Sequence, residues 1–98
     1  ERGICWAATI EVKEVFDWKP LQDYETDDLK NVLGIQGQLW SETITNKDYF
    51  DKMINPRLAA LAEIAWCTKA KRSWPQFRSS LLNNLEYLSK LGWKFHNF

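Results

Sequence analysis

A single candidate β-strand, set among helical segments, is the feature that most constrains the fold of this 98-residue chain. The candidate covers residues 32–42, where Leu33, Ile35 and Leu39 alternate with small or polar residues. A lone strand leaves its backbone N–H and C=O groups without partners, so those partners must lie outside the chain or in a second copy of it. The pattern predicts a portion of a larger α/β fold.

The two sides of this strand candidate differ in character. Residue parity gives an apolar set, Leu33, Ile35, Gly37 and Leu39, and a second set, Gly34, Gln36, Gln38 and Trp40. If the chain stays extended for two more residues, Glu42 joins the second face beside Trp40. Such faces suit a half-exposed sheet, or a barrel strand with helices outside and a polar funnel inside.

Helical patterns precede and follow the strand candidate. Thr9 is expected to cap a short helix that ends before Lys19, because apolar residues then recur at helical spacing. Residues 20–31 are polar and are expected to form a connection. A helical turn is expected over residues 46–54.

A longer helix is expected over residues 55–68. Asn55 and Pro56 form a start signal, with asparagine at the cap and proline at the first helical position. One stripe of this helix carries Leu58, Leu61, Ala62 and Ala65. Small residues on the stripe allow close approach, so we expect it to pack tightly against a sheet.

The last predicted helix covers residues 73–91. Ser73 and Gln76 have the spacing of a capping box, and Gly92 is a stop signal. The apolar positions at helical spacing are Phe77, Leu81, Leu85 and Leu88. The chain is therefore predicted to be predominantly helical.

Charge and residue inventory exclude several classes of function. Thirteen basic and thirteen acidic residues give no net charge, so the basic field that nucleic acid or an anionic membrane requires is absent. No apolar stretch approaches the roughly 20 residues of a membrane span. Cys5 and Cys67 lack CxxC spacing and His96 is far from both, so we expect no metal site, cofactor or nucleophilic triad. The redox state of the two thiols stays open.

The start of the chain is not expected to be a native initiation site. The first residue is Glu1, the sole methionine is Met53, and no signal-like segment is present at the N-terminus. A processed protein, a cloned fragment or a proteolytic remnant would have this form.

Three segments, taken in order, resemble motifs of family 20 glycoside hydrolases. Residues 34–43 resemble that family's last barrel strand, in which a Leu-Trp-x-Glu motif closes the pocket. Residues 56–63 resemble the Pro-Arg-x-x-Ala-x-Ala-Glu signature that opens the final barrel helix. Residues 1–7 are similar to the loop after the seventh strand in the bacterial chitobiase branch. Three motifs in the family's order are more specific than any one alone.

The resemblance implies a (β/α)8 TIM barrel, of which residues 1–98 would be the C-terminal portion. Residues 1–19 would be the loop and helix after strand 7, and residues 32–42 would be strand 8. Residues 55–68 would be helix 8, and residues 73–91 a C-terminal helix. Active sites of such barrels lie at the C-terminal ends of the strands, where the parity of the strand candidate puts Trp40 and Glu42.

The implied activity is that of an exo-acting β-N-acetylhexosaminidase or chitobiase. Such enzymes remove terminal N-acetylglucosamine, or N-acetylgalactosamine in some members, by a retaining mechanism in which the substrate's acetamido oxygen attacks the anomeric carbon. The catalytic Asp-Glu pair belongs to the fourth strand, and no segment here matches it. The implied partners are an N-acetylglucosamine-containing oligosaccharide and the remainder of the barrel. A periplasmic, cell-surface or secreted parent is favoured.

Three residues receive substrate-binding roles from the resemblance. Trp40 resembles the ring that stacks on the nonreducing sugar of the family's substrates. Its parity with two glutamines argues separately against a core position, because an apolar lumen would not hold them. Glu42 resembles the residue that accepts hydrogen bonds from the sugar's O4 and O6 hydroxyls. Trp6 resembles the ring that stacks on the second sugar, although loop tryptophans also serve as plugs of barrel tops.

Other prominent residues are interpreted as structural. Arg57 and Glu63 lie at the start of the 55–68 helix and within it, so an internal ion pair or a cap is expected there rather than chemistry. The tryptophans assigned to packing are Trp18, Trp66, Trp74 and Trp93.

Two functions of other classes compete with the glycosidase hypothesis. A small carbohydrate-binding module would use exposed tryptophans and need no acid, so the chain would bind chitooligosaccharides by itself. A ligand-free helical interaction domain would bury Trp40. The side to which Trp40 points separates these hypotheses.

Overall fold

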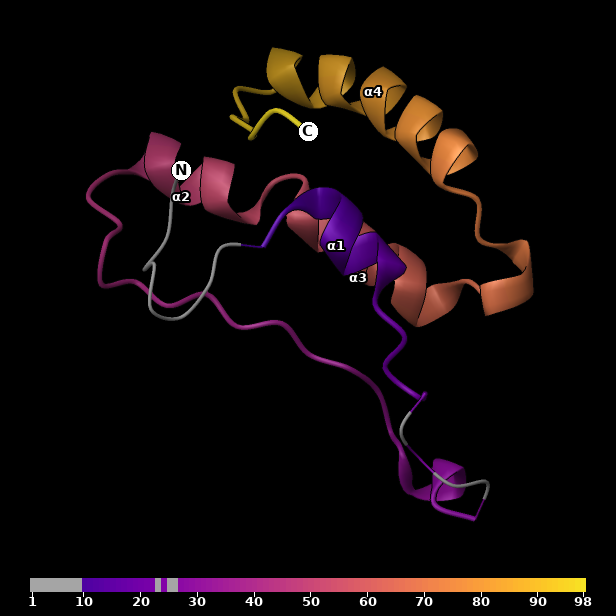
Figure 1. The fold of residues 1–98 in the computed structure, drawn as a ribbon. Helices are drawn as coiled ribbons and strands as arrows, with labels where there is room; N and C mark the ends of the chain where they lie inside the picture. The colour runs from indigo at the N-terminus through magenta and orange to yellow at the C-terminus, as the bar shows by residue number, and fades with distance from the viewer. Residues whose placement is uncertain (1–9, 23, 25–26) are drawn as a thin grey trace.

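A computed structural model describes residues 10–22, 24 and 27–98. The α-helices in this part of the chain are α1 (Val12–Asp17), α2 (Lys47–Ile54), α3 (Arg57–Trp66) and α4 (Trp74–Lys90). Two 3-10 turns, η2 (Leu29–Asn31) and η3 (Lys69–Lys71), complete the order of elements (Figure 1). The predominantly helical character is confirmed.

The core lies where α1, α3 and α4 meet. Five buried side chains form its centre: Val12 and Phe16 of α1, Ala60 of α3, and Leu81 and Leu85 of α4. The Phe16 ring lies 5.3 Å from that of Trp74 and 5.1 Å from that of Phe77, measured between centroids. The predicted apolar face of α4 and the packing role of Trp74 are therefore confirmed.

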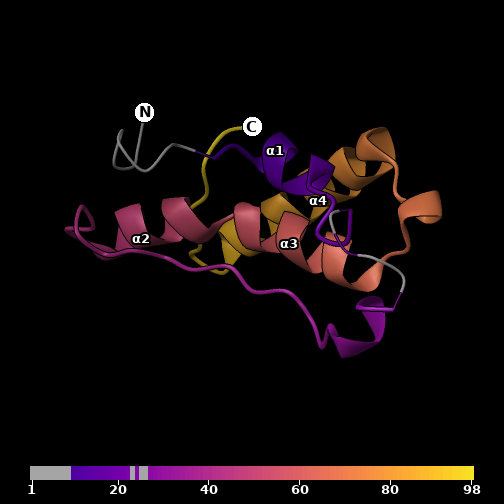
Figure 2. The ribbon, with the colours of Figure 1, turned by 60° about the horizontal axis from the view of Figure 1, so that its bottom comes forward.

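The β-strand predicted over residues 32–42 does not form. No strand is assigned anywhere in the described ranges. The segment after η2 runs as an extended chain past α3 and on to α2 (Figures 1 and 2). The physical reason is that a strand exists through hydrogen bonds to a neighbouring strand, and no described segment provides one.

The two alternating faces predicted for a strand are nevertheless present in this extended segment. A Cβ atom on Gly37 would lie 2.8 Å from Leu61 Cδ2, so one face lies directly against α3. Ile35 and Leu39, on the same face, are half-buried. The other face is open, with Gln36, Gln38 and Trp40 all exposed. Leu33 is the exception, because it is fully exposed although its parity places it on the apolar face.

Several predicted helix ends differ from the observed ones. Glu11, not Thr9, is the N-cap of α1, and Thr9 itself lies outside the described residues. Asn46 caps α2 as part of the predicted helical turn, with its Oδ1 accepting from the Tyr49 N–H at 2.8 Å. Ser73 is the N-cap of α4, but its side chain makes no capping hydrogen bond, so the predicted capping box is wrong.

The start of α3 is shifted from the prediction because Asn55 serves another helix. Pro56 occupies the N-cap of α3, which begins at Arg57 and ends at Trp66 rather than at residue 68. The Asn55 N–H donates to the Asp51 carbonyl and closes α2, and its side-chain amide donates to the Lys94 carbonyl at 3.3 Å. Asn55 is therefore not available as a cap for α3.

The expected stripe of α3 is largely uncovered. Leu61 packs on the extended segment, but the exposed residues of this helix are Leu58, Ala62, Ala65 and Trp66. Trp66 is 91% exposed, so its assignment to packing is wrong among the described residues.

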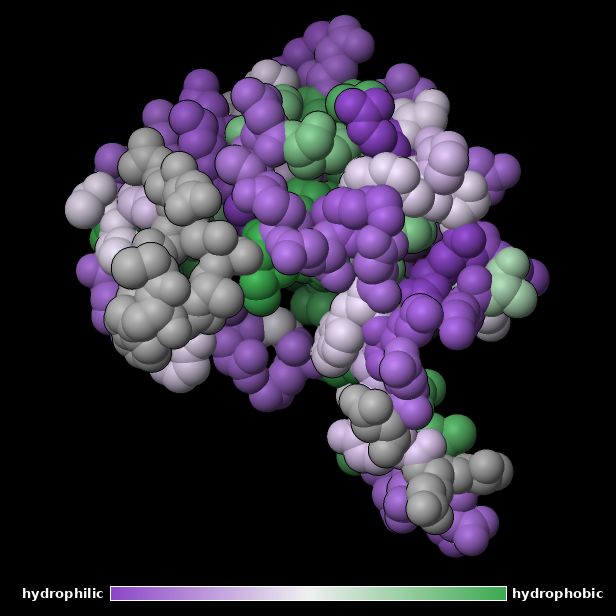
Figure 3. Space-filling model, in the orientation of Figure 1, coloured by the Kyte–Doolittle hydropathy of each residue, from purple (hydrophilic) through white to green (hydrophobic). Residues whose placement is uncertain are grey.

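The described part of the chain is also less compact than a typical domain. Its radius of gyration, 14.9 Å, exceeds the roughly 13 Å of a compact domain of this length. Apolar patches also break the polar surface in Figure 3. An apolar exposed helix face indicates a missing neighbour.

Gly92 ends α4 in the predicted way, and it yields a test. Its φ is +88°, and the N–H groups of Gly92 and Trp93 donate to the carbonyls of Ser89 and Leu88, the pairing of a Schellman motif. We expect Gly92→Ala to destabilise the protein by about 1 kcal/mol, because a Cβ disfavours this conformation. Gly34→Ala, where the added methyl would meet nothing within 4 Å, is the control in denaturant titration. Equal stability of the two variants would contradict the assignment.

Candidate functional site

The candidate site lies where the extended segment ends. Trp40 is 72% exposed, on the face turned away from α3. Glu42 is also exposed, but it lies in a turn closed by the Ile44 N–H donating to the Ser41 carbonyl at 3.0 Å. The expectation that Glu42 continues the extended face is therefore wrong, because the chain bends immediately before it. The two side chains still stand two residues apart at the same end of the segment.

These two groups suit a polyhydroxylated ligand. An indole ring offers a flat apolar face, and a carboxylate offers charged acceptors for hydroxyl groups. A pyranose ring has both complementary features, since its C–H groups gather on one face and its hydroxyls lie around its edge. An exposed indole and an exposed carboxylate can thus offer such a ring a stacking surface and hydrogen-bond acceptors.

The turn that carries Glu42 is tied to α2. The Tyr49 hydroxyl lies 3.5 Å from Thr43 Oγ1. A hollow of about 180 Å³ opens beside this contact, and it is lined by Thr45, Asn46, Asp48, Tyr49 and Lys52. Neither Trp40 nor Glu42 lines it.

Other predicted features fall partly outside the described residues. Trp6 and Cys5 both lie there, whereas Cys67 is a half-buried free thiol. Within the described ranges, no three His, Cys, Asp or Glu side chains gather as a metal site would require. The helices found in those ranges are too short or too polar to cross a membrane.

Comparison with protein families decides the affiliation of the chain. Residues 1–69 match the family model described as the glycosyl hydrolase family 20 catalytic domain. The match includes Trp6, Trp40, Glu42 and Arg57. The chain belongs to glycosyl hydrolase family 20.

Curated relatives of this family 20 chain are hexosaminidases much longer than it is. The β-N-acetylhexosaminidase of Cellulomonas fimi is 31% identical over 96 residues, which are 98% of this chain and 19% of that protein. The β-hexosaminidase of Vibrio furnissii is 42% identical over 71 residues, 70% of this chain and 12% of that protein. The chain thus spans a fifth or less of the length of these relatives.

A solved family 20 structure has the same fold over the matched part. The crystal structure of a GH20 exo-β-N-acetylglucosaminidase from Vibrio harveyi, in complex with N-acetylglucosamine, matches with a TM-score of 0.87 at 35% identity. The match covers 97% of this chain and 15% of that one. The arrangement of helices in the family 20 chain is therefore similar to that of one part of this larger enzyme.

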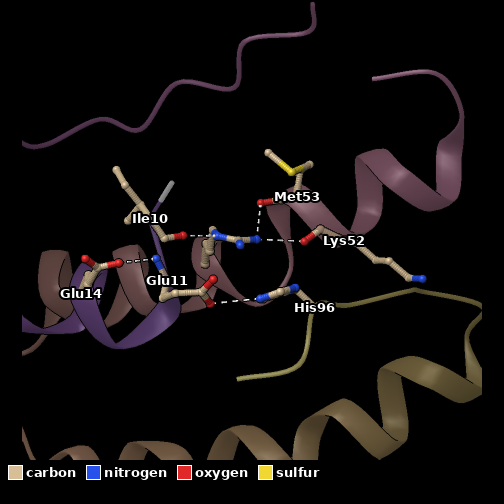
Figure 4. A network of polar contacts seen from close by, with 7 residues as sticks. Ile10, Glu11, Glu14, Lys52, Met53 and His96 are labelled. Carbon is tan, nitrogen blue, oxygen red and sulfur yellow. Dashed lines mark hydrogen bonds and ion pairs between the residues drawn. The ribbon is translucent and has the colours of Figure 1, made fainter. Parts of the chain in front are cut away.

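Arg57 of the family 20 signature acts as a cap, one of the two predicted roles. Its Nη1 donates to the carbonyls of Lys52 and Met53, at 2.9 and 3.1 Å, and its Nε donates to the Ile10 carbonyl at 2.6 Å (Figure 4). The last carbonyls of a helix lack partners within it and carry partial negative charge, so a guanidinium there stabilises the end of α2.

The contacts that hold the C-terminal tail against the rest of the chain were not predicted from the sequence. His96 Nε2 lies 3.0 Å from Glu11 Oε2, although 85 positions separate the two residues and no local pattern relates them (Figure 4). Asp51, 2% exposed, accepts from Lys47 Nζ at 2.7 Å and from the Lys94 N–H at 3.3 Å. Of these contacts, only the ion pair between Lys47 and Asp51 could be expected from the sequence, because residues four positions apart are neighbours on a helix.

The environment of Asp51 predicts acid sensitivity. The hydrogen bond from Lys47 holds the pKa of the Asp51 carboxyl below its usual 3.8, the Lys94 N–H adds to this, and burial opposes it. A lowered pKa contributes stability that is present above the ordinary pKa and lost as pH falls through the lowered one. We expect the Tm of Asp51→Asn to fall less steeply than that of the wild type as pH drops below about 4. Asp48 is exposed on the same helix, so Asp48→Asn is the control and should show the wild-type decline of Tm. Parallel declines in all three proteins would contradict this.

Proposed function

We propose that this chain is part of an exo-acting β-N-acetylhexosaminidase that removes terminal N-acetylglucosamine from chitooligosaccharides or glycans. The observation that carries the proposal is the family 20 catalytic-domain match over residues 1–69. The names of the relatives support it, among them an N,N′-diacetylchitobiase of Vibrio harveyi, 31% identical over 84 residues, 67% of this chain and 10% of that protein.

Within that enzyme, the chain forms the C-terminal portion of a (β/α)8 barrel. Of residues 32–42, predicted as strand 8, those before the Glu42 turn, residues 32–40, pair on both edges with strands from the rest of the enzyme, and α3 is helix 8 on the outside. The contact between Gly37 and Leu61 supports this, because it puts one face of the segment against the helix and leaves the other free for a lumen. The exposed apolar residues of α3 then cover neighbouring barrel elements.

Trp40 and Glu42 supply part of the sugar pocket. Trp40 stacks on the apolar face of the nonreducing sugar, and its 72% exposure on the open face leaves the ring free to do so. Glu42 accepts hydrogen bonds from the O4 and O6 hydroxyls. Trp6 stacks on the second sugar, beyond the scissile bond.

The chemistry itself lies outside these residues. In substrate-assisted retention, the acetamido oxygen attacks the anomeric carbon while a protein acid protonates the leaving oxygen. The Asp-Glu pair that orients the acetamido group and supplies this proton in the family has no match in this sequence. Trp40 and Glu42 therefore contribute by holding the ring in a reactive position.

The 98-residue chain alone is expected to be inactive. It lacks the catalytic pair and most of the pocket walls, so a nitrophenyl N-acetylglucosaminide should release no nitrophenol above the buffer rate. The full-length enzyme assayed in parallel is the control. Measurable turnover by the chain alone would overturn the division of labour proposed here, and an inactive full-length enzyme would overturn the proposed function.

The exposure of Trp40 separates the two competing hypotheses, the ligand-free interaction domain and the carbohydrate-binding module. A ligand-free interaction domain requires a buried Trp40, and its 72% exposure is contrary to that requirement. A carbohydrate-binding module is compatible with an exposed tryptophan, so titration of the chain alone with chitotriose separates it from the glycosidase. Saturable binding with quenching of tryptophan fluorescence would favour the module.

A further inference from the structure

We propose that residues 93–98 act as a strap that holds α2, and with it the turn that carries Glu42, against the three-helix core. This tail leaves the end of α4 and turns back toward the other helices (Figure 1). The part of the inference that concerns α2 is independent of the proposed function. The part that concerns Glu42 rests on that function, because it takes the turn to contact sugar.

The first step concerns the attachment of α2. The core joins α1, α3 and α4, and among the described residues no side chain of α2 belongs to it. The buried side chain of α2 is that of Asp51, a carboxylate. Helices in proteins are held mainly by packing of an apolar face, so α2 needs other contacts to keep its place. Arg57 supplies two of them, at the last turn of α2.

The second step concerns one side of the strap, which is fixed in the core. The rings of Phe95 and Phe98 pack against the buried cluster of α1, α3 and α4. The guanidinium carbon of Arg78, on α4, lies 5.8 Å from the centroid of the Phe98 ring. Because aromatic rings bring large apolar area into a core, these two side chains anchor the strap.

The third step concerns the other side of the strap, which binds the end of α2. The Lys94 N–H donates to Asp51 Oδ2 at 3.3 Å, and the Asn55 side-chain amide donates to the Lys94 carbonyl at 3.3 Å. The His96 N–H donates to the Asn55 carbonyl at 2.9 Å. Backbone groups of alternate residues therefore face α2, while the ring of the residue between them, Phe95, packs against the core. A β-strand pairs with its neighbour and buries a side chain in the same way.

Two further contacts complete the attachment of the strap. His96 Nε2 lies 3.0 Å from Glu11 Oε2, at the N-cap of α1 (Figure 4). Lys47 Nζ, from the first residue of α2, lies 5.6 Å from the centroid of the Trp93 ring. The strap thus contacts α2 near both of its ends, the core, and the entry to α1.

The fourth step connects α2 to the Glu42 turn. The Ile44 N–H closes this turn, and Asn46, the cap of α2, follows two residues later. The Tyr49 hydroxyl of α2 lies 3.5 Å from Thr43 Oγ1. A shift of α2 would therefore move the turn and Glu42 with it.

The test measures amide hydrogen exchange in the full-length enzyme by mass spectrometry. Phe95→Ala removes an anchor of the strap, so peptides of α2 should exchange about tenfold faster, whereas those of α1 and α3 should stay within about twofold of wild type. Asn97→Ala, at an exposed position of the same strap, is the matched control and should change no rate. His96→Ala leaves both rings in the core and removes the contact with Glu11, so it should raise the exchange of α2 about threefold.

Steady-state kinetics on a nitrophenyl N-acetylglucosaminide test the link to Glu42. A turn that binds sugar without taking part in the chemistry affects binding. We therefore expect Phe95→Ala to raise KM about fivefold and to change kcat less than about twofold. Asn97→Ala should retain both wild-type values.

Exchange and kinetics can each contradict a different part of the proposal. Unchanged exchange in α2, or an equal rise in α1, α2 and α3, would overturn the strap. If Phe95→Ala does not fold, His96→Ala alone decides between these outcomes. Faster exchange of α2 with an unchanged KM would overturn the link to Glu42. A wild-type enzyme that does not hydrolyse the glycoside would overturn the proposed function and leave the exchange result standing.

Discussion

Glu42→Gln in the full-length enzyme is expected to lower kcat/KM on N-acetylglucosaminides roughly ten- to a hundredfold while leaving the fold intact. The substitution keeps the shape of the side chain but turns a charged acceptor into a neutral amide. A hydrogen bond to a charged group contributes about 1.5–3 kcal/mol, which corresponds to that range of rate. Steady-state kinetics with a nitrophenyl glycoside, together with a thermal melt, would measure the effect.

Glu86→Gln is the matched control for this substitution. Glu86 is exposed on α4, where its carboxylate lies 3.6 Å from Lys90 Nζ, and it has no place in the proposed pocket. Its amide variant should retain wild-type kinetics. A Glu42→Gln enzyme with vanishing kcat that azide restores would mark Glu42 as a catalytic acid, and an unchanged enzyme would remove Glu42 from the pocket.

The second large effect is expected at Phe16, where α1 meets α4. Its ring is 7% exposed and contacts two other aromatic rings, so Phe16→Ala removes a large buried surface and leaves a cavity. Such truncations cost about 3–5 kcal/mol. Denaturant unfolding should show the corresponding drop in midpoint without a change in slope.

Phe50→Ala provides the comparison for the Phe16 variant. Phe50 lies on α2 and is 41% exposed, so the same truncation removes less buried area there. We expect a loss of about 1 kcal/mol or less. If the two variants lost equal stability, the three-helix core described above would not be the one that holds the fold.

Local patterns predicted most of the helical organisation. The spacing of apolar residues in α4, the helical turn over residues 46–54 and the stop at Gly92 were readable because each depends on neighbours within a few positions. The caps at Thr9 and Asn55 were wrong because other contacts decide those ends. Asn55 closes α2 and binds the Lys94 carbonyl, a contact between residues 39 positions apart.

The candidate site was predictable in part for a similar reason. Parity along residues 32–40 identified the open face with Trp40, since alternation survives in any extended chain. The bend at Ser41 was not foreseen, because it comes from a turn that the strand pattern does not encode. The links from Arg57 to Ile10 and from His96 to Glu11 join distant parts of the chain, and one sequence carries no signal for them.

The central claim is that the open face of residues 32–40 lines a sugar pocket within a barrel completed by the rest of the enzyme. A crystal structure of the full-length enzyme with N-acetylglucosamine bound tests it most directly. We expect residues 33–39 to hydrogen-bond to a strand on each edge, the Trp40 ring to stack on the sugar, and Glu42 to bond its O4 and O6 hydroxyls. An unpaired segment, or a sugar bound away from Trp40 and Glu42, would contradict it.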